Sequence, residues 1–257
     1  MKSLNCFRNK LGLPDREDIN IKSSASFEEK LAVILDENVP IFSFTFGILP
    51  ENIILQIKKQ GIKIIGTATT VREAKLLEKS GVDIIVAQGY EAGGHRGTDL
   101  KLASINDALI GTMALVPQIV DAVNIPVVAS GGIMDKRGIS ASHALGASGV
   151  QMGTAFLGCP ESNIHESHRK LLFSSTDEST RLTSAFTGRM ARSIKNDFLL
   201  EVENSKNPIL DFPIQSAMVK DIRDEAKKKI ILNSCLFGLG KPVLCVKTNQ
   251  LLRSWMT

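Results

Sequence analysis

The chain has 257 residues, 43% of them hydrophobic, which is enough apolar material for one large α/β domain or a domain with a small appendage. The net charge is only +4, and a single Tyr and a single Trp are available for base stacking, so the composition argues against nucleic-acid binding. No uncharged apolar run is long enough to cross a bilayer, so we expect no membrane association and a soluble, cytoplasmic protein.

The first 24 residues are polar and contain Pro14, which predicts a loosely structured lead-in with one short helix. A helix is predicted from Ser26 to about Glu37. Ser26 and Glu29 have the spacing of a capping box, and the apolar residues that follow recur at helical intervals.

From Pro40 onward, short β-rich runs alternate with helical patterns. We expect strands near 41–46, 62–67, 83–88, 126–130 and 149–156. Helices are predicted between them, in the segments 51–61, 71–81, 112–123 and 140–146. Alternation with short connections predicts a parallel sheet with right-handed crossovers.

Beyond Cys159 the pattern changes to a mostly helical segment, with helices expected in 161–180 and 216–232. A basic run, Arg189, Arg192 and Lys195, could bind phosphate, but a solvated helix face is the favoured interpretation. The four cysteines lie far apart without CxxC spacing, which fits reduced thiols rather than a zinc cluster or a secreted disulfide framework (Cys6, Cys159, Cys235 and Cys245).

Chemistry is predicted at the carboxyl ends of three successive strands. The segment 83–97, DIIVAQGYEAGGHRG, runs from a buried strand into the amide of Gln88, the paired glycines Gly93 and Gly94, and His95. The later strands run into SGG, with Gly131, and into QMGT at 151–154. Glycine amides at such ends suit a ligand's phosphate, and a turn is the simpler alternative for each segment taken alone.

His95 is the strongest catalytic candidate because it titrates near neutral pH and follows the end of a buried strand. The other histidines are assigned to structure or solvent (His143, His165 and His168). A metal site on His165 and His168 lacks an obvious third ligand, so we expect no metal.

These segments closely resemble the nitronate monooxygenase family, formerly called 2-nitropropane dioxygenases, which are FMN-dependent enzymes on a TIM barrel. The resemblance is carried by AQGYEAGGHRG at 87–97, PVVASGGI at 126–133 and GVQMGTAFL at 149–157. It is supported by FSFTFG at 42–47, IGTATT at 65–70 and FTGRMAR at 186–192.

The resemblance implies that FMN is held by the residues named at the strand ends (Gln88, Gly93, Gly131, Gln151, Met152, Gly153 and Thr154). It implies that His95 is the catalytic base, removing the α-proton of a nitroalkane where needed. The implied reaction oxidises alkyl nitronates or nitroalkanes with dioxygen to carbonyl compounds and nitrite. A similar family is the FMN-dependent enoyl-acyl carrier protein reductase, which usually has AEG and HIG where this chain has AQG and HRG.

A complete barrel has eight strands, and the sequence predicts about five. The family's first strand carries an APM-like motif and its third strand precedes an asparagine, and neither is found before Pro40. We therefore expect an incomplete (β/α)8 barrel lacking its N-terminal strands. One hypothesis is an active enzyme in which a second chain or a partner subunit supplies these strands. The alternatives are a degenerate fragment without catalysis and a non-catalytic flavin-binding module.

The expected organisation has three segments. Residues 1–40 are the lead-in and first helix, residues 41–158 the FMN-binding partial barrel, and residues 159–257 a helical C-terminal segment packing on the barrel.

Overall fold

The structure is a computed structural model that describes residues 2–18 and 25–229. These residues group into two compact units. The parallel unit consists of residues 25–92 and 96–152, and the antiparallel unit consists of residues 2–18, 93–95 and 153–229. The lead-in thus groups with the C-terminal segment, whereas the sequence analysis treated the two as separate segments. The predicted packing of the C-terminal segment on the barrel stays a prediction.

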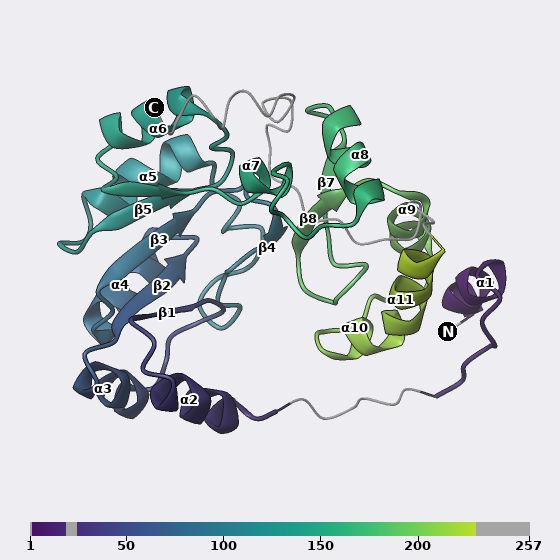
Figure 1. Cartoon of the computed structure of the whole chain (residues 1–257), viewed down its shortest axis with the longest axis horizontal. Helices are drawn as coiled ribbons and strands as arrows, with labels where there is room; N and C mark the ends of the chain where they lie inside the picture. Colours follow the sequence, from purple (N-terminus) through teal and green to yellow (C-terminus); the bar gives the residue numbers. More distant parts are fainter. Residues whose placement is uncertain (1, 19–24, 230–257) are drawn as a thin grey trace. The chain divides into compact units, whose positions relative to one another are not determined.

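The parallel unit is built on a five-stranded parallel sheet in the order β1-β2-β3-β5-β6 (Figure 1). Its strands are β1 Ile41–Phe44, β2 Lys63–Ala68, β3 Ile84–Gln88, β5 Val127–Ser130 and β6 Gly149–Gln151. All five predicted strands are confirmed, but the last was predicted too long. β6 ends at Gln151, because the short helix α7 (Thr154–Leu157) follows almost at once.

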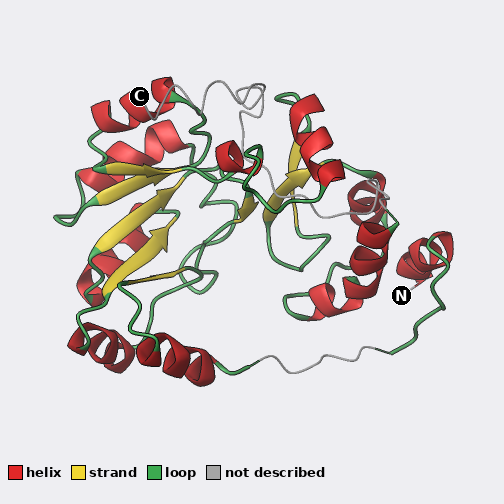
Figure 2. Cartoon of the chain, viewed as in Figure 1, coloured by secondary structure: helices red, strands yellow, loops and turns green. Residues whose placement is uncertain are grey.

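Helices connect successive strands of this sheet, as Figure 2 shows by colour. The connecting helices are α3 Glu51–Lys59, α4 Val71–Ser80, α5 Thr112–Val120 and α6 Lys136–Ala144, and α2 Phe27–Asp36 precedes the first strand. The predicted capping box of α2 is confirmed, because the Ser26 side chain accepts from the Glu29 amide and the Glu29 carboxylate accepts from the Ser26 amide. α6 begins four residues before its predicted start, where the Asp135 side chain accepts from the Arg137 amide as an N-cap.

Burial differs between the centre of the parallel sheet and its first strand. The centre of β3 is buried on both faces, as predicted, because Ile85, Val86 and Ala87 are consecutive and at most 3% exposed. At the first strand of the sheet, Ile41 is 54% exposed. Five parallel strands joined by helices form the repeating pattern of a (β/α)8 barrel, and the described part of the chain contributes five of its strands.

The antiparallel unit corrects the prediction of a mostly helical C-terminal segment. It contains a three-stranded antiparallel sheet in the order β4-β8-β7, formed by β4 Gly94–His95, β7 Thr180–Thr183 and β8 Ala191–Ile194. Its helices are α1 Lys2–Lys10, α7, α8 Glu166–Ser174, α9 Asp197–Asn204, α10 Ile214–Met218 and α11 Lys220–Lys228. Part of the predicted helix 216–232 lies outside the described residues.

The basic run was also predicted wrongly. Arg192 lies in the buried strand β8, whereas Arg189 precedes that strand and the exposed Lys195 follows it, so the run does not form a helix face. Arg192 is 1% exposed, and its Nη1 donates to Thr180 Oγ1 at 3.2 Å. Helical periodicity could not have identified a strand of four residues whose pairing partners lie far away in the sequence.

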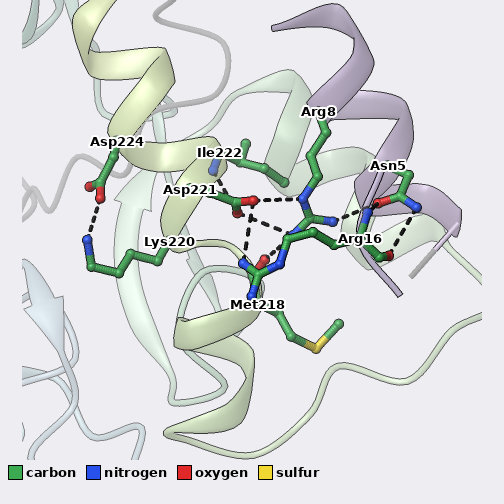
Figure 3. A network of polar contacts seen from close by, with 8 residues as sticks. All are labelled: Asn5, Arg8, Arg16, Met218, Lys220, Asp221, Ile222 and Asp224. Atoms are coloured by element: carbon green, nitrogen blue, oxygen red, sulfur yellow. Dashed lines mark hydrogen bonds and ion pairs between the residues drawn. The ribbon is translucent and has the colours of Figure 1, made fainter. Parts of the chain in front are cut away.

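Helix α1 is held firmly to the rest of the antiparallel unit, contrary to the expectation of a loose lead-in (Figure 3). The Arg8 side chain is fully buried. Its Nε donates to Asp221 Oδ2 at 2.8 Å, and its Nη2 donates to the Met218 carbonyl at 2.6 Å. Its Nη1 donates to Asn5 Oδ1 at 2.8 Å. Burial alone would raise the pKa of Asp221, but the bonds from Arg8 hold this pKa below its usual value.

Candidate functional site

The carboxyl ends of the parallel strands lie at one edge of the sheet, and two glycines bring their loops into close contact there. A Cβ on Gly97 would lie 2.5 Å from Thr45 Oγ1 and 3.0 Å from Thr67 Cγ2, so the loop after β3 passes directly over the ends of β1 and β2. A Cβ on Gly131 would lie 3.1 Å from the Ala92 nitrogen and 3.2 Å from the Gly89 oxygen. The predicted convergence of strand-end loops is therefore present within the parallel unit.

Gln88 is the last residue of β3, and its amide has a defined orientation. Oε1 accepts from the Gly97 amide at 2.8 Å and from Arg96 Nη1 at 3.2 Å. Both partners can only donate, so the oxygen end of the amide is turned toward them.

Arg96 organises this loop, although the sequence analysis gave it no structural role. It is 1% exposed, and it donates from Nη1 to the Gly89 carbonyl at 2.5 Å and from Nη2 to the Ala108 carbonyl at 2.9 Å. A buried guanidinium that bonds two carbonyls and the Gln88 side chain fixes the path of the chain after β3. The position of Arg96 next to His95 was the only signal in the sequence that pointed to a role for this residue.

Glu73 supports the same loop from helix α4. Its buried carboxylate accepts from the Thr69 amide at 2.6 Å through Oε2 and from the Asp99 amide at 2.7 Å through Oε1. The capping box at Thr70 uses this same side chain. One carboxylate therefore joins the end of β2 to the chain that follows Gly97.

Gly131 has a backbone conformation that favours glycine, with φ at +118°, and the next residue, Gly132, has φ at +71°. Within residues 2–18 and 25–229, their amides donate to no backbone carbonyl. The Gly131 carbonyl accepts from Thr112 Oγ1 at 2.8 Å, and Glu91 Oε2 accepts from the Thr112 amide at 2.9 Å. This contact connects the SGG turn to the start of α5, with two backbone amides available for an anionic ligand.

The QMGT segment is divided between the two units. Gln151 ends β6 and is exposed, and Met152 packs partly against the core of the parallel unit. Gly153 and Thr154 belong to the antiparallel unit. No atom lies within 4 Å of a Cβ built on Gly153, and Thr154 is 7% exposed. The predicted cofactor contacts of these four residues stay predictions, as do those of Gly93, which is exposed.

His95 lies in β4, where it pairs with Ala191 of β8. Its Nε2 lies 2.9 Å from Thr187 Oγ1. Burial lowers the pKa of His95, and the nearby charges of Arg189 and Arg223 lower it further. The imidazole is therefore neutral at pH 7 and able to accept a proton.

The other histidines have structural surroundings. His143 is exposed on α6, and its Nδ1 lies 3.0 Å from the Ala147 carbonyl. His165 is the N-cap of α8, and His168 is buried in the same helix. Among the described residues, no group of three or more His, Cys, Asp or Glu side chains is arranged to hold a metal ion. The described cysteines are free thiols (Cys6 and Cys159), and Cys235 and Cys245 lie outside the described residues.

The parallel sheet with interleaved helices and its loops meeting at the carboxyl edge defines an α/β protein of the TIM-barrel class. A sequence profile described as nitronate monooxygenase matches residues 6–235. The chain therefore belongs to the nitronate monooxygenase family, whose members are in general flavoenzymes.

Curated relatives support the assignment. The chain is 46% identical over 211 residues to a probable nitronate monooxygenase of Staphylococcus saprophyticus, a match covering 82% of this chain and 59% of the relative. It is 49% identical over 208 residues to a probable nitronate monooxygenase of Staphylococcus aureus, covering 81% of this chain and 58% of the relative. The chain thus spans less than two thirds of the length of either relative.

Solved structures agree with the fold. The nitroalkane oxidase from Streptomyces ansochromogenes superposes with a TM-score of 0.88 at 35% identity, covering 98% of this chain and 74% of the other. FabK from Thermotoga maritima gives a TM-score of 0.71 at 27% identity, covering 98% of this chain and 80% of the other. These comparisons do not support a second chain that supplies barrel strands.

No helix in the described ranges is both long and apolar enough to cross a membrane.

Proposed function

We propose that this chain carries the FMN and nitronate chemistry of its family: oxidation of alkyl nitronates or nitroalkanes by dioxygen to carbonyl compounds and nitrite. The observation that carries the proposal is the strand-end arrangement of the parallel unit, where an oriented Gln88 amide and the amides of Gly131 and Gly132 lie on the loops of neighbouring strands. Family membership and the similarity to a nitroalkane oxidase give this arrangement its chemical meaning.

The residues at this edge fit a phosphorylated flavin. Gly131 has no room for a side chain and offers its amide at the end of β5, which suits a phosphate oxygen. Gln88 ends the neighbouring strand β3, and its amide oxygen is held by the Gly97 amide and Arg96. We assign Gly93, Gln151, Met152, Gly153 and Thr154 to the same cofactor by their place in the family motifs. FMN, when bound, supplies the electron transfer to dioxygen that no side chain can perform.

His95 has the proton-transfer role in this proposal. Because its pKa is lowered, the neutral imidazole is present at pH 7 and can accept the α-proton of a nitroalkane. A nitronate has already lost that proton, so its oxidation does not need the base. The overall reaction balances as two nitronates and one dioxygen to two carbonyl compounds and two nitrites: each C–N bond breaks to release nitrite, and each carbon gains one oxygen atom derived from dioxygen.

The proposal is tested with purified protein. We expect a flavin absorbance spectrum, FMN as the extracted cofactor by mass spectrometry, and nitrite release from 2-nitropropane. His95→Ala should lose nitroalkane oxidation while keeping more of the nitronate oxidation, and His143→Ala, at an exposed histidine, should keep both. Protein without flavin, or a His95→Ala variant with full nitroalkane activity, would contradict the proposal.

A second candidate is a flavin-dependent reductase, favoured by the structural similarity to FabK. Anaerobic reduction of the bound flavin distinguishes the reductase from the nitronate-oxidising enzyme. Rapid bleaching by NADH with no bleaching by a nitronate would favour the reductase, and the reverse result would favour the nitronate oxidation proposed above. The cytoplasmic location expected from the sequence stays a prediction.

A further inference from the structure

Thr187 contacts the imidazole of His95 although 91 residues separate them in the sequence. Its Oγ1 lies 2.9 Å from His95 Nε2, and the threonine is 5% exposed. The contact lies wholly within the antiparallel unit.

Both partners are held by backbone hydrogen bonds. β4 pairs with β8 with His95 opposite Ala191, which sets the position of the imidazole. The Thr187 amide donates to the Ser184 carbonyl at 3.2 Å, and the Gly188 amide donates to the same oxygen at 2.8 Å. Gly188 has φ at +80°, and a Cβ there would lie 2.2 Å from the Leu210 oxygen, so this turn accepts only glycine.

The Thr187 hydroxyl has three neighbours and a single proton to donate. The Arg189 amide donates to Oγ1 at 3.2 Å, and the Arg189 carbonyl lies 3.1 Å from Oγ1. The third neighbour is His95 Nε2, which can be a donor or an acceptor according to the tautomer.

Only one assignment of protons satisfies all three contacts. If the hydroxyl donates to the Arg189 carbonyl, then Oγ1 accepts from the Arg189 amide and from an Nε2–H of His95. If the hydroxyl donates to His95 instead, two oxygen acceptors face each other at 3.1 Å without a proton between them. The first assignment is therefore the stable one.

We propose that Thr187 is a positioning residue that holds His95 as the Nε2–H tautomer, so that Nδ1 is the nitrogen that accepts the α-proton of the substrate. The role assigned to Nδ1 rests on the proposed function, whereas the tautomer itself does not. In the step, the C–H bond of the nitroalkane breaks, its electron pair stays on the substrate as the nitronate, and the proton goes to Nδ1. Nε2 keeps its proton and its bond to Thr187 throughout.

The tautomer is read by two-bond proton–nitrogen NMR of the imidazoles in the full-length protein as purified, at pH 7.5 and without substrate. Wild type should show His95 protonated on Nε2. Thr187→Ser should keep this pattern, because it keeps the hydroxyl. Thr187→Val should shift the tautomer ratio about fivefold toward Nδ1–H, the change expected from losing one hydrogen bond of ordinary net strength.

Thr183→Val is the matched control. Thr183 is also a buried threonine of the antiparallel unit, and its Oγ1 accepts from the Ala185 amide at 3.1 Å. We expect this variant to leave the His95 signals unchanged. In kinetics, Thr187→Val should lower kcat for a nitroalkane more than it changes KM, and Thr187→Ser should restore kcat.

Two results would overturn the proposal: an Nδ1–H tautomer in wild type, or an unchanged tautomer ratio in a folded Thr187→Val variant. If Thr187→Val does not fold, the wild-type spectrum still decides between the tautomers. The spectrum requires no turnover, so a protein without nitronate activity but with His95 protonated on Nε2 would refute the proposed function and leave the tautomer assignment intact.

Discussion

Acidification should destabilise the antiparallel unit through His168. This histidine lies on α8, is 9% exposed, and has its pKa lowered to about 4, first by burial and then by the charge of Lys227. The unfolded chain has the ordinary value of 6.5. Between these two values the unfolded state binds a proton that the folded state does not, so the free energy of unfolding falls as the pH falls.

The magnitude follows from the difference between the two pKa values. Each unit of difference corresponds to about 1.4 kcal/mol, so the full contribution is about 3 kcal/mol once the pH is below both values. About 2 kcal/mol of it is already lost between pH 7.5 and pH 5. Above pH 6.5 the histidine is neutral in both states and the effect disappears.

The assay is urea unfolding of wild type and of His168→Gln, followed by circular dichroism at pH 7.5 and pH 5. Carboxylates also titrate in this range, so the informative quantity is the difference between the two proteins. We expect His168→Gln to lose about 2 kcal/mol less than wild type on acidification.

Parallel pH dependence of wild type and His168→Gln would refute the reasoning, because it would mean that His168 is not kept neutral by the folded structure. Hydrogen exchange in α8 and α11 provides a local check. Their amides should exchange faster at pH 5 than at pH 7.5, after correction for the intrinsic rates, in wild type but not in His168→Gln.

Three other predictions concern the contacts of Arg8 on α1, the turn at Gly131 and the proton-transfer role proposed for His95. Arg8→Met should lower the free energy of unfolding in urea by about 3 kcal/mol, because it leaves the partly buried Asp221 carboxylate without its partner. The control Lys228→Met removes an exposed ion pair and should lower it by less than about 0.5 kcal/mol. Gly131→Ala should lower the free energy of unfolding by about 1–2 kcal/mol and reduce the flavin bound per protein. The control Gly149→Ala, whose new Cβ would meet no atom closer than 3.9 Å, should keep the flavin. Nitroalkane oxidation should decline only at a pH below 6.5, since the pKa of His95 is lowered and the neutral form is the base; a decline centred above 6.5 would contradict the assignment.

Local sequence patterns predicted a helix or strand correctly where the pattern lies within that element or at its end. Alternating β-rich runs and helical patterns predicted all five strands of the parallel sheet, and the Ser26 capping box placed the start of α2. The AQGYEAGGHRG segment predicted a strand leading into a functional loop. These signals are local because periodicity and capping depend on residues a few positions apart.

The antiparallel unit shows where such signals fail. β4 has two residues, and β7 and β8 have four each, and none of them lies in an alternation of strands and helices like the one that identified the equally short strands β1 and β5. The sheet exists because His95 is brought to Ala191 and because Thr183 pairs with the same alanine. Pairing between residues this far apart in sequence depends on the tertiary structure.

The sequence by itself determined the class of fold and the family, since each rests on a contiguous motif or a repeating pattern, and it singled out His95 as a catalytic candidate, which stays a prediction. Only the tertiary structure decided that Arg96 directs the loop after β3, that the Gln88 amide oxygen accepts from Gly97, and that His95 contacts Thr187. The reason is physical: a motif specifies which chemical groups are present, whereas the direction of each donor and acceptor is set by partners that folding brings from distant parts of the chain.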